Sequence, residues 1–294
     1  MKLLSLTGGG TSGYMTCKLL EKVEDVLGVS IADRVDMIAG TSTGAIIAAG
    51  LARGYSASYL ALMYKQLQED IFGKPKGFIR SLFQPKYDSS KLIEIAKDVY
   101  GDETFGSEDL KCHLLIPALS LSRPELMPKF WKTYDGKDSS VRLRDAVLAS
   151  ISIPAMFPPY KIGDKYYYDG GMCVNNPTLP AIADIIKMPK LGCTPQEDIH
   201  AVVINTDFHS GFSNPEKFKG LYSIYKDVIS FCIDGSERAS DYVTRAILSE
   251  GNFINVVPQV YIQADSNDWE SMEREVLNQW ELHGDNLIRY FKDV

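Results

Sequence analysis

Within its first 53 residues the chain repeats one pattern: a short apolar run, a glycine-rich turn and a stretch with helical spacing. Residues 3–6 lead into the glycines of 8–13, and residues 14–27 then carry apolar side chains at helical intervals. Residues 35–39 lead in the same way into the turn 40–44 and a run of small residues. Apolar strands that are each followed by a helix are typical of a parallel sheet covered by helices on both faces. The sequence therefore predicts an α/β fold with a largely parallel sheet.

The rest of the chain continues this organisation without a repeat or a long linker. We expect one domain over residues 1–294, with a motif-bearing core at about 2–206 and a mostly helical C-terminal part at 207–294. Further strands are predicted at 113–119, 129–131, 165–168 and 201–205, and further helices at 59–71, 144–150 and 269–291.

Composition and charge exclude several classes of protein. There are 31 basic and 38 acidic residues, and the net charge of −7 argues against a broad nucleic-acid surface. The longest apolar stretch, 45–52, is too short to span a membrane, and the N-terminus lacks the pattern of a signal peptide. The five cysteines are scattered and form no C-x-x-C pair, and the four histidines lack metal-ligand spacing. We expect a cytoplasmic protein with reduced thiols, no metal and no cofactor.

The turn 40–44 has the form Gly-x-Ser-x-Gly, with Ser42 at its centre. A nucleophilic serine must be exposed at the end of a strand with backbone donors nearby, and a sharp strand-to-helix turn provides both. Such a turn leaves room only for small neighbours, here Gly40 and Gly44. The helix that begins at Thr43 directs its amide groups and the positive end of its dipole toward Ser42. The alternative interpretation is a plain packing turn.

Three consecutive glycines, Gly8, Gly9 and Gly10, follow the first strand, and Gly13 lies at the start of the helix. Their backbone N–H groups are open to a ligand, so the loop suits either the oxyanion of an acyl transfer or a phosphate. The spacing also fits G-x-G-x-x-G, but the next strand ends in the serine turn and not in the acid of a dinucleotide site. A P-loop is excluded because no Gly-Lys-Ser/Thr follows.

Asp169 ends a tyrosine-rich strand and is followed by Gly170 and Gly171. Alone, this would be an ordinary Asp-Gly turn. Together and in this order, the three motifs resemble the patatin-like phospholipase family. Residues 35–44 resemble the nucleophile strand and elbow of that family. Residues 149–159 resemble its helix and proline turn, and 168–177, with Asn175-Asn176-Pro177, its aspartate motif.

The resemblance covers about residues 2–206 and implies a three-layer α/β/α sandwich that hydrolyses acyl esters of phospholipids and related lipids without a metal. It implies that Ser42 is the nucleophile and Asp169 the general base of a Ser–Asp dyad without histidine. The oxyanion hole would be formed by the glycine loop and the elbow, and other glycines would support the motifs. These residues are Gly8, Gly9, Gly10, Gly13 and Thr43 for the oxyanion hole, and Gly40, Gly44, Gly170 and Gly171 for support.

Two positions depart from the family pattern. Thr7 stands where the family usually has Asp, and Ser12 stands where it usually has Arg or Lys. A cation at the second position would support the oxyanion loop, whereas a serine supplies no charge. The dyad residues themselves are intact.

Three alternatives to this interpretation remain open at the level of sequence. The first is an α/β-hydrolase esterase with a triad, because His200, His209 or His283 follows Ser42 and Asp169 in the required order. The second is a non-catalytic nucleotide-binding module built on the Gly8 loop. The third keeps the phospholipase chemistry in a bacterial effector that a partner or a cyclic nucleotide switches on. Headgroup preference and oligomeric state have no signal in the sequence.

Residues 72–87 combine a local charge of +4 with six apolar or aromatic side chains and contain no acid. One interpretation is a cap that contacts an anionic lipid surface peripherally. The other is a connector whose aromatic side chains pack on the core. The candidate contact residues are Lys74, Lys76, Phe78, Arg80 and Phe83.

Overall fold

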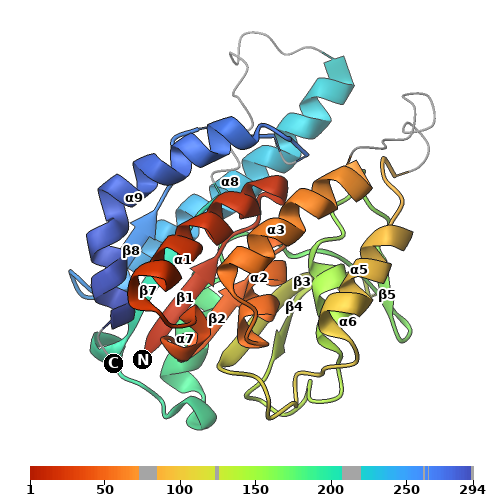
Figure 1. Ribbon diagram of the computed structural model, residues 1–294. Helices are drawn as coiled ribbons and strands as arrows, with labels where there is room; N and C mark the ends of the chain where they lie inside the picture. The colour runs from red at the N-terminus through yellow and green to blue at the C-terminus, as the bar shows by residue number, and fades with distance from the viewer. Residues whose placement is uncertain (73–84, 123–125, 207–219, 261, 264, 293–294) are drawn as a thin grey trace.

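The computed structural model describes the chain apart from residues 73–84, 123–125, 207–219, 261, 264 and 293–294. Its middle layer is an eight-stranded sheet with helices on both faces (Figure 1). The strands are β1 (Lys2–Leu6), β2 (Met37–Gly40), β3 (His113–Ser120), β4 (Met127–Lys132), β5 (Tyr160–Ile162), β6 (Lys165–Asp169), β7 (His200–Ile204) and β8 (Phe253–Val256).

The strand order is β5-β6-β3-β2-β1-β7-β8, and β4 pairs with the second edge of β3. The five strands from β3 to β8 in this order are mutually parallel, whereas β4, β5 and β6 join by antiparallel pairing. The predicted α/β class with a largely parallel sheet is therefore confirmed.

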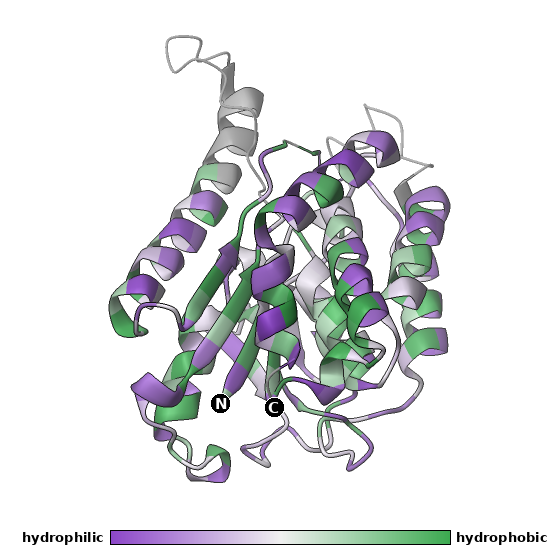
Figure 2. Cartoon of the chain, turned by 60° about the vertical axis from the view of Figure 1, so that its left-hand side comes forward, coloured by the Kyte–Doolittle hydropathy of each residue, from purple (hydrophilic) through white to green (hydrophobic). Residues whose placement is uncertain are grey.

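Helices form the two outer layers of the sandwich. On one side lie α1 (Gly13–Leu27), α2 (Thr43–Ala52), α3 (Ala57–Leu67), α5 (Ser90–Tyr100), α6 (Leu143–Ser150) and α9 (Trp269–Lys292), and on the other lie α7 (Thr178–Lys187) and α8 (Gly220–Ile247). Side chains alternate along each strand, so Leu4 and Ile38 enter the first core and Leu3 and Met37 the second. Figure 2 shows the resulting pattern, with hydrophobic strands between helices that carry hydrophilic residues on their outer surfaces.

Most predicted elements are present within one or two residues of their expected ends. The helix predicted at 59–71 begins at Ala57 and changes after Leu67 into a π-helical turn, η3 (Gln68–Phe72). Five elements were not predicted: α5, α7, α8, β5 and β8. The short strand β8 lies in the C-terminal part and pairs with β7, so this part contributes to the sheet as well as to the helical layers.

The last helix packs against the first strand and the first helix. Lys2 Nζ donates a hydrogen bond to the carbonyl oxygen of Tyr290 at 2.6 Å, and the Tyr290 hydroxyl donates to the carbonyl oxygen of Leu3 at 3.0 Å. Leu287 and Phe291 are fully buried in the core beneath α1. The end of α9 and the start of β1 therefore lie side by side at one end of the molecule (Figure 1).

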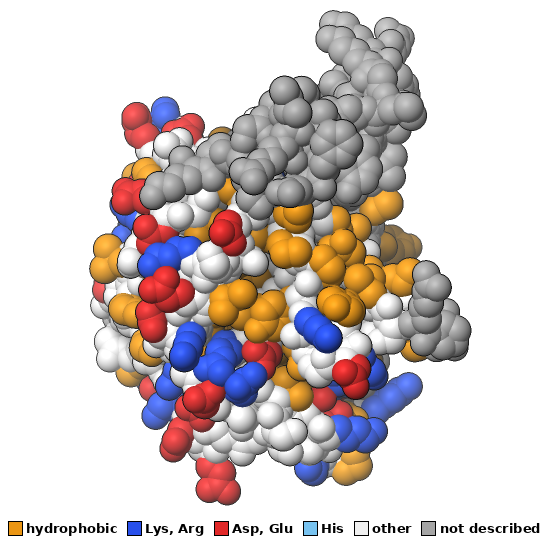
Figure 3. Space-filling model, turned by 90° about the vertical axis from the view of Figure 1, so that its right-hand side faces the viewer, with side chains coloured by type: hydrophobic (Ala, Val, Ile, Leu, Met, Phe, Trp, Pro, Cys, Tyr) orange, Lys and Arg blue, Asp and Glu red, His pale blue; other side chains and the backbone are white. Residues whose placement is uncertain are grey.

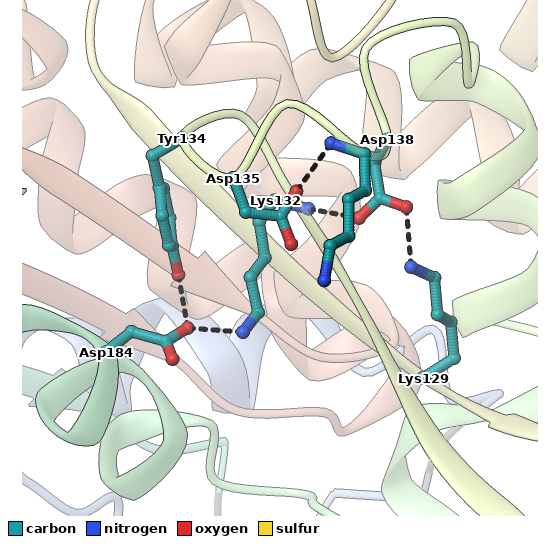
Figure 4. A network of polar contacts seen from close by, with 7 residues as sticks. Lys129, Lys132, Tyr134, Asp135, Asp138 and Asp184 are labelled. Atoms are coloured by element: carbon teal, nitrogen blue, oxygen red, sulfur yellow. Dashed lines mark hydrogen bonds and ion pairs between the residues drawn. The ribbon is translucent and has the colours of Figure 1, made fainter. Parts of the chain in front are cut away.

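A network of charged groups joins β4 to α7 on the other side of the sheet (Figure 4). Asp184 Oδ2 accepts hydrogen bonds from the Tyr134 hydroxyl and from Lys132 Nζ, both at 2.7 Å. Asp138 Oδ1 accepts from Lys129 Nζ at 2.5 Å, and its Oδ2 accepts from the backbone N–H of Lys132. Tyr134 is buried, and burial together with Asp184 raises the pKa of its hydroxyl.

We predict that Asp184→Ala lowers the free energy of unfolding by about 1–3 kcal/mol, because it leaves the buried Tyr134 hydroxyl without its acceptor. Urea denaturation measures the change. The matched control is Asp98→Ala, an exposed acid on helix α5, which should change stability by less than about 0.5 kcal/mol. Equal losses for the two variants would contradict the structural role of the network.

Candidate active site

Strands β2 and β6 meet end to end along the same edge of β3. Ala39 pairs with Leu115 of β3 in parallel, and Asp169 pairs with Ala118 in antiparallel orientation. Pro117 lies in the gap between the two strand ends and has no N–H that would need a partner there. Its carbonyl oxygen accepts a hydrogen bond from Ser150 Oγ at 2.7 Å. This arrangement brings the turn after β2 and the end of β6 to one point.

Ser42 occupies the first of these strand ends in a strained backbone conformation. Its φ of 52° and ψ of −120° lie where residues with a side chain are rarely found. Its N–H donates to Ser150 Oγ at 3.0 Å. A Cβ on Gly40 would lie 2.2 Å from the carbonyl oxygen of Gly44, and one on Gly44 would lie 2.3 Å from that of Leu6. These close approaches explain the glycines of the predicted elbow.

Asp169 lies directly beside the serine. Its Oδ2 accepts a hydrogen bond from Ser42 Oγ at 2.7 Å, and its Oδ1 accepts one from the N–H of Gly171 at 2.7 Å. The side chain is 2% exposed. Burial raises the pKa of Asp169 to about 7, against the opposing effect of the two hydrogen bonds. A carboxylate with this pKa is a much stronger base than one in water.

The glycine loop forms the wall opposite Asp169. Thr43 Oγ1 donates to the carbonyl oxygen of Gly10 at 2.7 Å and so joins the loop to helix α2. Within the part of the chain that the structure describes, the N–H groups of Gly9 and Gly10 have no acceptor. Gly13 differs from the other three glycines, because it packs against Thr43 and Tyr64 beneath the loop and does not line the pocket.

A deep pocket opens above Ser42, Asp169 and the loop. It encloses about 780 Å³ including its open mouth. Apart from Ser42, Asp169 and a few polar groups around them, its walls are apolar, and Asp169 is the only ionisable acid or base among the described lining residues other than Tyr64. The apolar walls are formed by Ile46, Leu67, Ile71, Leu92, Ile151, Ile153, Met156, Phe157 and Ile233.

The remaining predicted site residues are distributed as follows. Thr43 and Gly171 line the pocket, and Gly170 packs against Pro117 next to Asp169. Lys74, Lys76, Phe78, Arg80 and Phe83 lie outside the described residues. Among the described residues at the end of that segment, Tyr87 is buried, and both its hydroxyl and Lys86 Nζ donate to Asp265.

Sequence reasoning assigned no individual role to three polar residues that hold the site together: Ser150, Asn175 and Thr206. The first two lie in the stretches 149–159 and 168–177 that resemble the family. Ser150 bridges the Ser42 amide and Pro117, as described above. Asn175 and Thr206 both donate to the carbonyl oxygen of Gly8, at 3.3 and 2.6 Å. Thr206 follows the end of the strand predicted at 201–205, and polar residues at the carboxyl ends of parallel strands are where ligand sites form. That signal was available in the sequence.

Comparison with known proteins identifies the family of this chain. A family model described as patatin-like phospholipase matches residues 4–182, and the chain belongs to this family. A cGAMP-activated phospholipase of Vibrio cholerae is 34% identical over 218 residues, which cover 64% of this chain and 58% of that protein. Another of Escherichia coli is 34% identical and covers 64% of this chain and 56% of that protein. The 85/88 kDa calcium-independent phospholipase A2 of Rattus norvegicus is 26% identical and covers 62% of this chain and 23% of that protein.

The match thus spans a little more than half the length of these two bacterial relatives. Among the described residues, no helix has both the length and the apolar character needed to cross a bilayer. The same residues contain no group of three or more His, Cys, Asp or Glu side chains arranged for a metal ion.

Because Asp169 is buried, we expect the free energy of unfolding to fall as the pH rises and this carboxyl group loses its proton. Its pKa is about 7 in the folded chain and near 3.8 when exposed, so between these values the folded state holds a proton that the unfolded state has lost. Stability contributed by this group is therefore lost as pH rises from about 4 to 7, by roughly 4 kcal/mol at most, since each pH unit is worth about 1.4 kcal/mol. We predict that Asp169→Asn unfolds at a higher temperature than wild type at pH 8.

The same variant should lose most of this advantage as the pH falls toward 4, because protonated aspartic acid and asparagine are then equally uncharged. Thermal unfolding of both proteins across this range measures the effect. Asp98→Asn, at an exposed position, serves as control and should show no such trend. A stability difference that does not change with pH would contradict the raised pKa.

Proposed function

We propose that this chain is a serine lipid acyl hydrolase, of phospholipase A or lysophospholipase type, that works through Ser42 and Asp169. The observation that carries the proposal is the 2.7 Å hydrogen bond from Ser42 Oγ to Asp169 Oδ2 at the bottom of an apolar pocket. Family membership and the phospholipase relatives support the same class of reaction.

In the proposed mechanism Ser42 Oγ attacks the ester carbonyl while Asp169 removes its proton. The carbonyl oxygen becomes an oxyanion, which the N–H groups of Gly9 and Gly10 bind. The tetrahedral intermediate then collapses: Asp169 gives its proton to the departing alcohol, and the acyl group stays on Ser42. As a carboxylate again, Asp169 removes a proton from the water that attacks this acyl group, and returns it to Ser42 Oγ when the fatty acid leaves. Loss of one such oxyanion donor costs about 2.7–4 kcal/mol in a serine protease where it was measured.

The walls of the pocket favour a lipid as the substrate. Beyond the polar groups around Ser42, an acyl chain that enters from the mouth would contact aliphatic and aromatic side chains of the described lining residues, and burying each of its methylene groups is worth about 0.8 kcal/mol. Figure 3 shows hydrophobic side chains gathered in the middle of the face that lies on the right in Figure 1. In the outer helical layer, Leu62 on α3 and Ile93 on α5 are exposed hydrophobic residues. Such a surface suits contact with lipid aggregates.

The positions of the described histidines favour the dyad over a triad that uses His200 or His283, whereas His209 lies outside the described residues. His113 and His200 begin β3 and β7, at the end of the parallel sheet opposite to Ser42, and His283 lies on α9. None of these three described histidines lines the Ser42 pocket. The nucleotide-module alternative is disfavoured because no cation stands among the described lining residues to pair with phosphates.

We predict that Ser42→Ala and Asp169→Asn each remove nearly all hydrolysis of phospholipid vesicles, because they delete the nucleophile and the proton acceptor without changing the shape of the site. His200→Ala and His283→Ala are the controls and should retain most of the activity. Release of fatty acid is measured with and without cGAMP, since the relatives of Vibrio cholerae and Escherichia coli are named for activation by it.

A folded His variant as inactive as Asp169→Asn would reject the dyad. Wild-type protein that releases no fatty acid from any lipid in either condition, and that no fluorophosphonate labels at Ser42, would reject the hydrolase proposal altogether.

A second, smaller cavity beside the Ser42 pocket predicts a preference for long acyl chains. This cavity between α3, α5 and α6 shares Ile46, Leu67, Leu92 and Ile151 with the pocket above Ser42. A long acyl chain would pass Leu92 to reach it. Leu92→Trp should therefore lower kcat/KM for a palmitate ester at least roughly tenfold more than for a butyrate ester, because lost burial of methylene groups accumulates. Leu282→Trp, at an exposed position on α9, should leave this ratio unchanged.

A further inference from the structure

We propose that Thr206 and Asn175 are positioning residues that aim the N–H of Gly9 into the oxyanion site by holding the carbonyl of Gly8 from behind. The proposal rests on the proposed acyl hydrolase function. It states that two residues outside the dyad raise the rate of ester hydrolysis. Neither residue touches the reacting ester in this scheme. Both act through a single peptide unit of the glycine loop.

Thr206 supplies the stronger of the two restraints. Its hydroxyl donates to the carbonyl oxygen of Gly8 at 2.6 Å, and its own N–H donates to Thr7 Oγ1 at 3.0 Å. Thr206 and Thr7 are each 1% exposed, so no water competes for these groups. The side chain of Thr206 also fills the space beside Gly9, where a Cβ would come within 2.0 Å of Thr206 Oγ1. The loop is thus fixed by contact as well as by hydrogen bonding.

Asn175, which follows the turn after Asp169, supplies the second restraint. Its Nδ2 donates to the carbonyl oxygen of Gly8 at 3.3 Å and to Glu237 Oε2 at 2.5 Å. Asn175 is 2% exposed and stands in the wall of the pocket near Gly171. The amide therefore links three parts of the chain: the glycine loop, the turn after Asp169 and helix α8. Glu237 fixes the direction in which the Asn175 amide points.

The geometry of a peptide bond connects these contacts to the oxyanion. In a trans peptide the C=O of one residue and the N–H of the next lie in one plane and point in opposite directions. Fixing the Gly8 carbonyl with two donors therefore fixes the Gly9 N–H on the other side of the same plane. That N–H has no acceptor among the described residues, and Gly9 lines the pocket together with Ser42. It is available for an oxyanion.

A loop of three glycines needs such restraints. Glycine has access to more backbone conformations than any other residue, so an unrestrained Gly8–Gly9 peptide would rotate among several orientations. An oxyanion donor stabilises the transition state only when it is already aimed at the place where charge develops. Because the loop carries no side chains of its own at 8–10, the orienting groups must come from elsewhere in the fold.

The test compares Thr206→Val with wild type, since valine keeps the shape and lacks only the hydroxyl. We expect kcat on a soluble ester and the rate of Ser42 phosphonylation by an alkyl fluorophosphonate to fall roughly 10- to 100-fold, less than the complete loss of a donor. KM should stay within about twofold, because the ground-state ester makes little use of the hole. Thr206→Ser, which keeps the hydroxyl, should recover most of the rate.

The matched control is Thr244→Val. Thr244 is fully buried, and its hydroxyl donates to a backbone carbonyl, that of Ser240, at 2.8 Å, but on helix α8 away from the loop. This variant loses the same kind of bond and should keep kcat within about threefold of wild type. A similar fall in both valine variants would make the role of Thr206 merely structural and overturn the proposal.

Two further outcomes decide the proposal. If Thr206→Val keeps kcat within threefold, or changes KM and not kcat, Thr206 does not position the hole. If that variant does not fold, Asn175→Ala replaces it, with the same expected fall in kcat and phosphonylation at constant KM and the same grounds for rejection. Wild type that neither hydrolyses esters nor is phosphonylated at Ser42 rejects the proposed function, which separates that failure from failure of this inference.

Discussion

The hydrogen bond between Ser42 and Asp169 joins residues 127 positions apart, and the arrangement of the sheet serves to make it possible. The two strands that end at these residues, β2 and β6, both pair with β3, β2 in parallel and β6 in antiparallel orientation. Pro117 of β3 lies in the gap between the ends of β2 and β6, where the backbone N–H of any other residue would lack a partner. Ser150 then ties the elbow to β3 through one hydroxyl. A change in the register of either strand would separate the two side chains by several ångströms.

The same bond explains why a carboxylate is kept in an apolar pocket. Burial of a charged group costs stability, and here the cost appears as the raised pKa of Asp169. The fold does not remove this cost by placing a cation nearby, since the described lining residues hold none. Two hydrogen bonds, from Ser42 and Gly171, offset only part of it. The pKa of Asp169 therefore stays raised, and a carboxylate with a raised pKa is a better general base at neutral pH.

Local patterns were sufficient to predict the elbow, the glycine loop and the aspartate turn, because each depends on residues close together in sequence. The strand-turn-helix units around Ser42 and Gly8 were visible from periodicity and glycine spacing. The partnership of Thr206 with Thr7 was not visible, because it depends on the pairing of β7 with β1, and the two threonines lie 199 residues apart in sequence. Strand β8 was also missed, since its four residues, Phe-Ile-Asn-Val, show no clear alternation of apolar and polar side chains.

The two departures from the family pattern have a consistent electrostatic interpretation. Thr7 forms a buried pair with Thr206, and Ser12 is buried beneath the loop, so both positions are neutral and enclosed. A missing cation would matter if negative charge accumulated during the reaction. In the proposed mechanism it does not, because Asp169 becomes neutral when it takes the proton and the charge passes to the oxyanion. The pocket holds one negative charge before and after this step.

Burial disfavours that charge on Asp169, whereas the amides of the glycine loop favour it at the new position. The proposed reaction therefore requires that these amides already be correctly oriented, and the uncharged hydrogen bonds from Thr206 and Asn175 to the Gly8 carbonyl would meet this requirement. In such a site, rigidity of the Gly8–Gly9 peptide takes the place that a nearby positive charge would otherwise have.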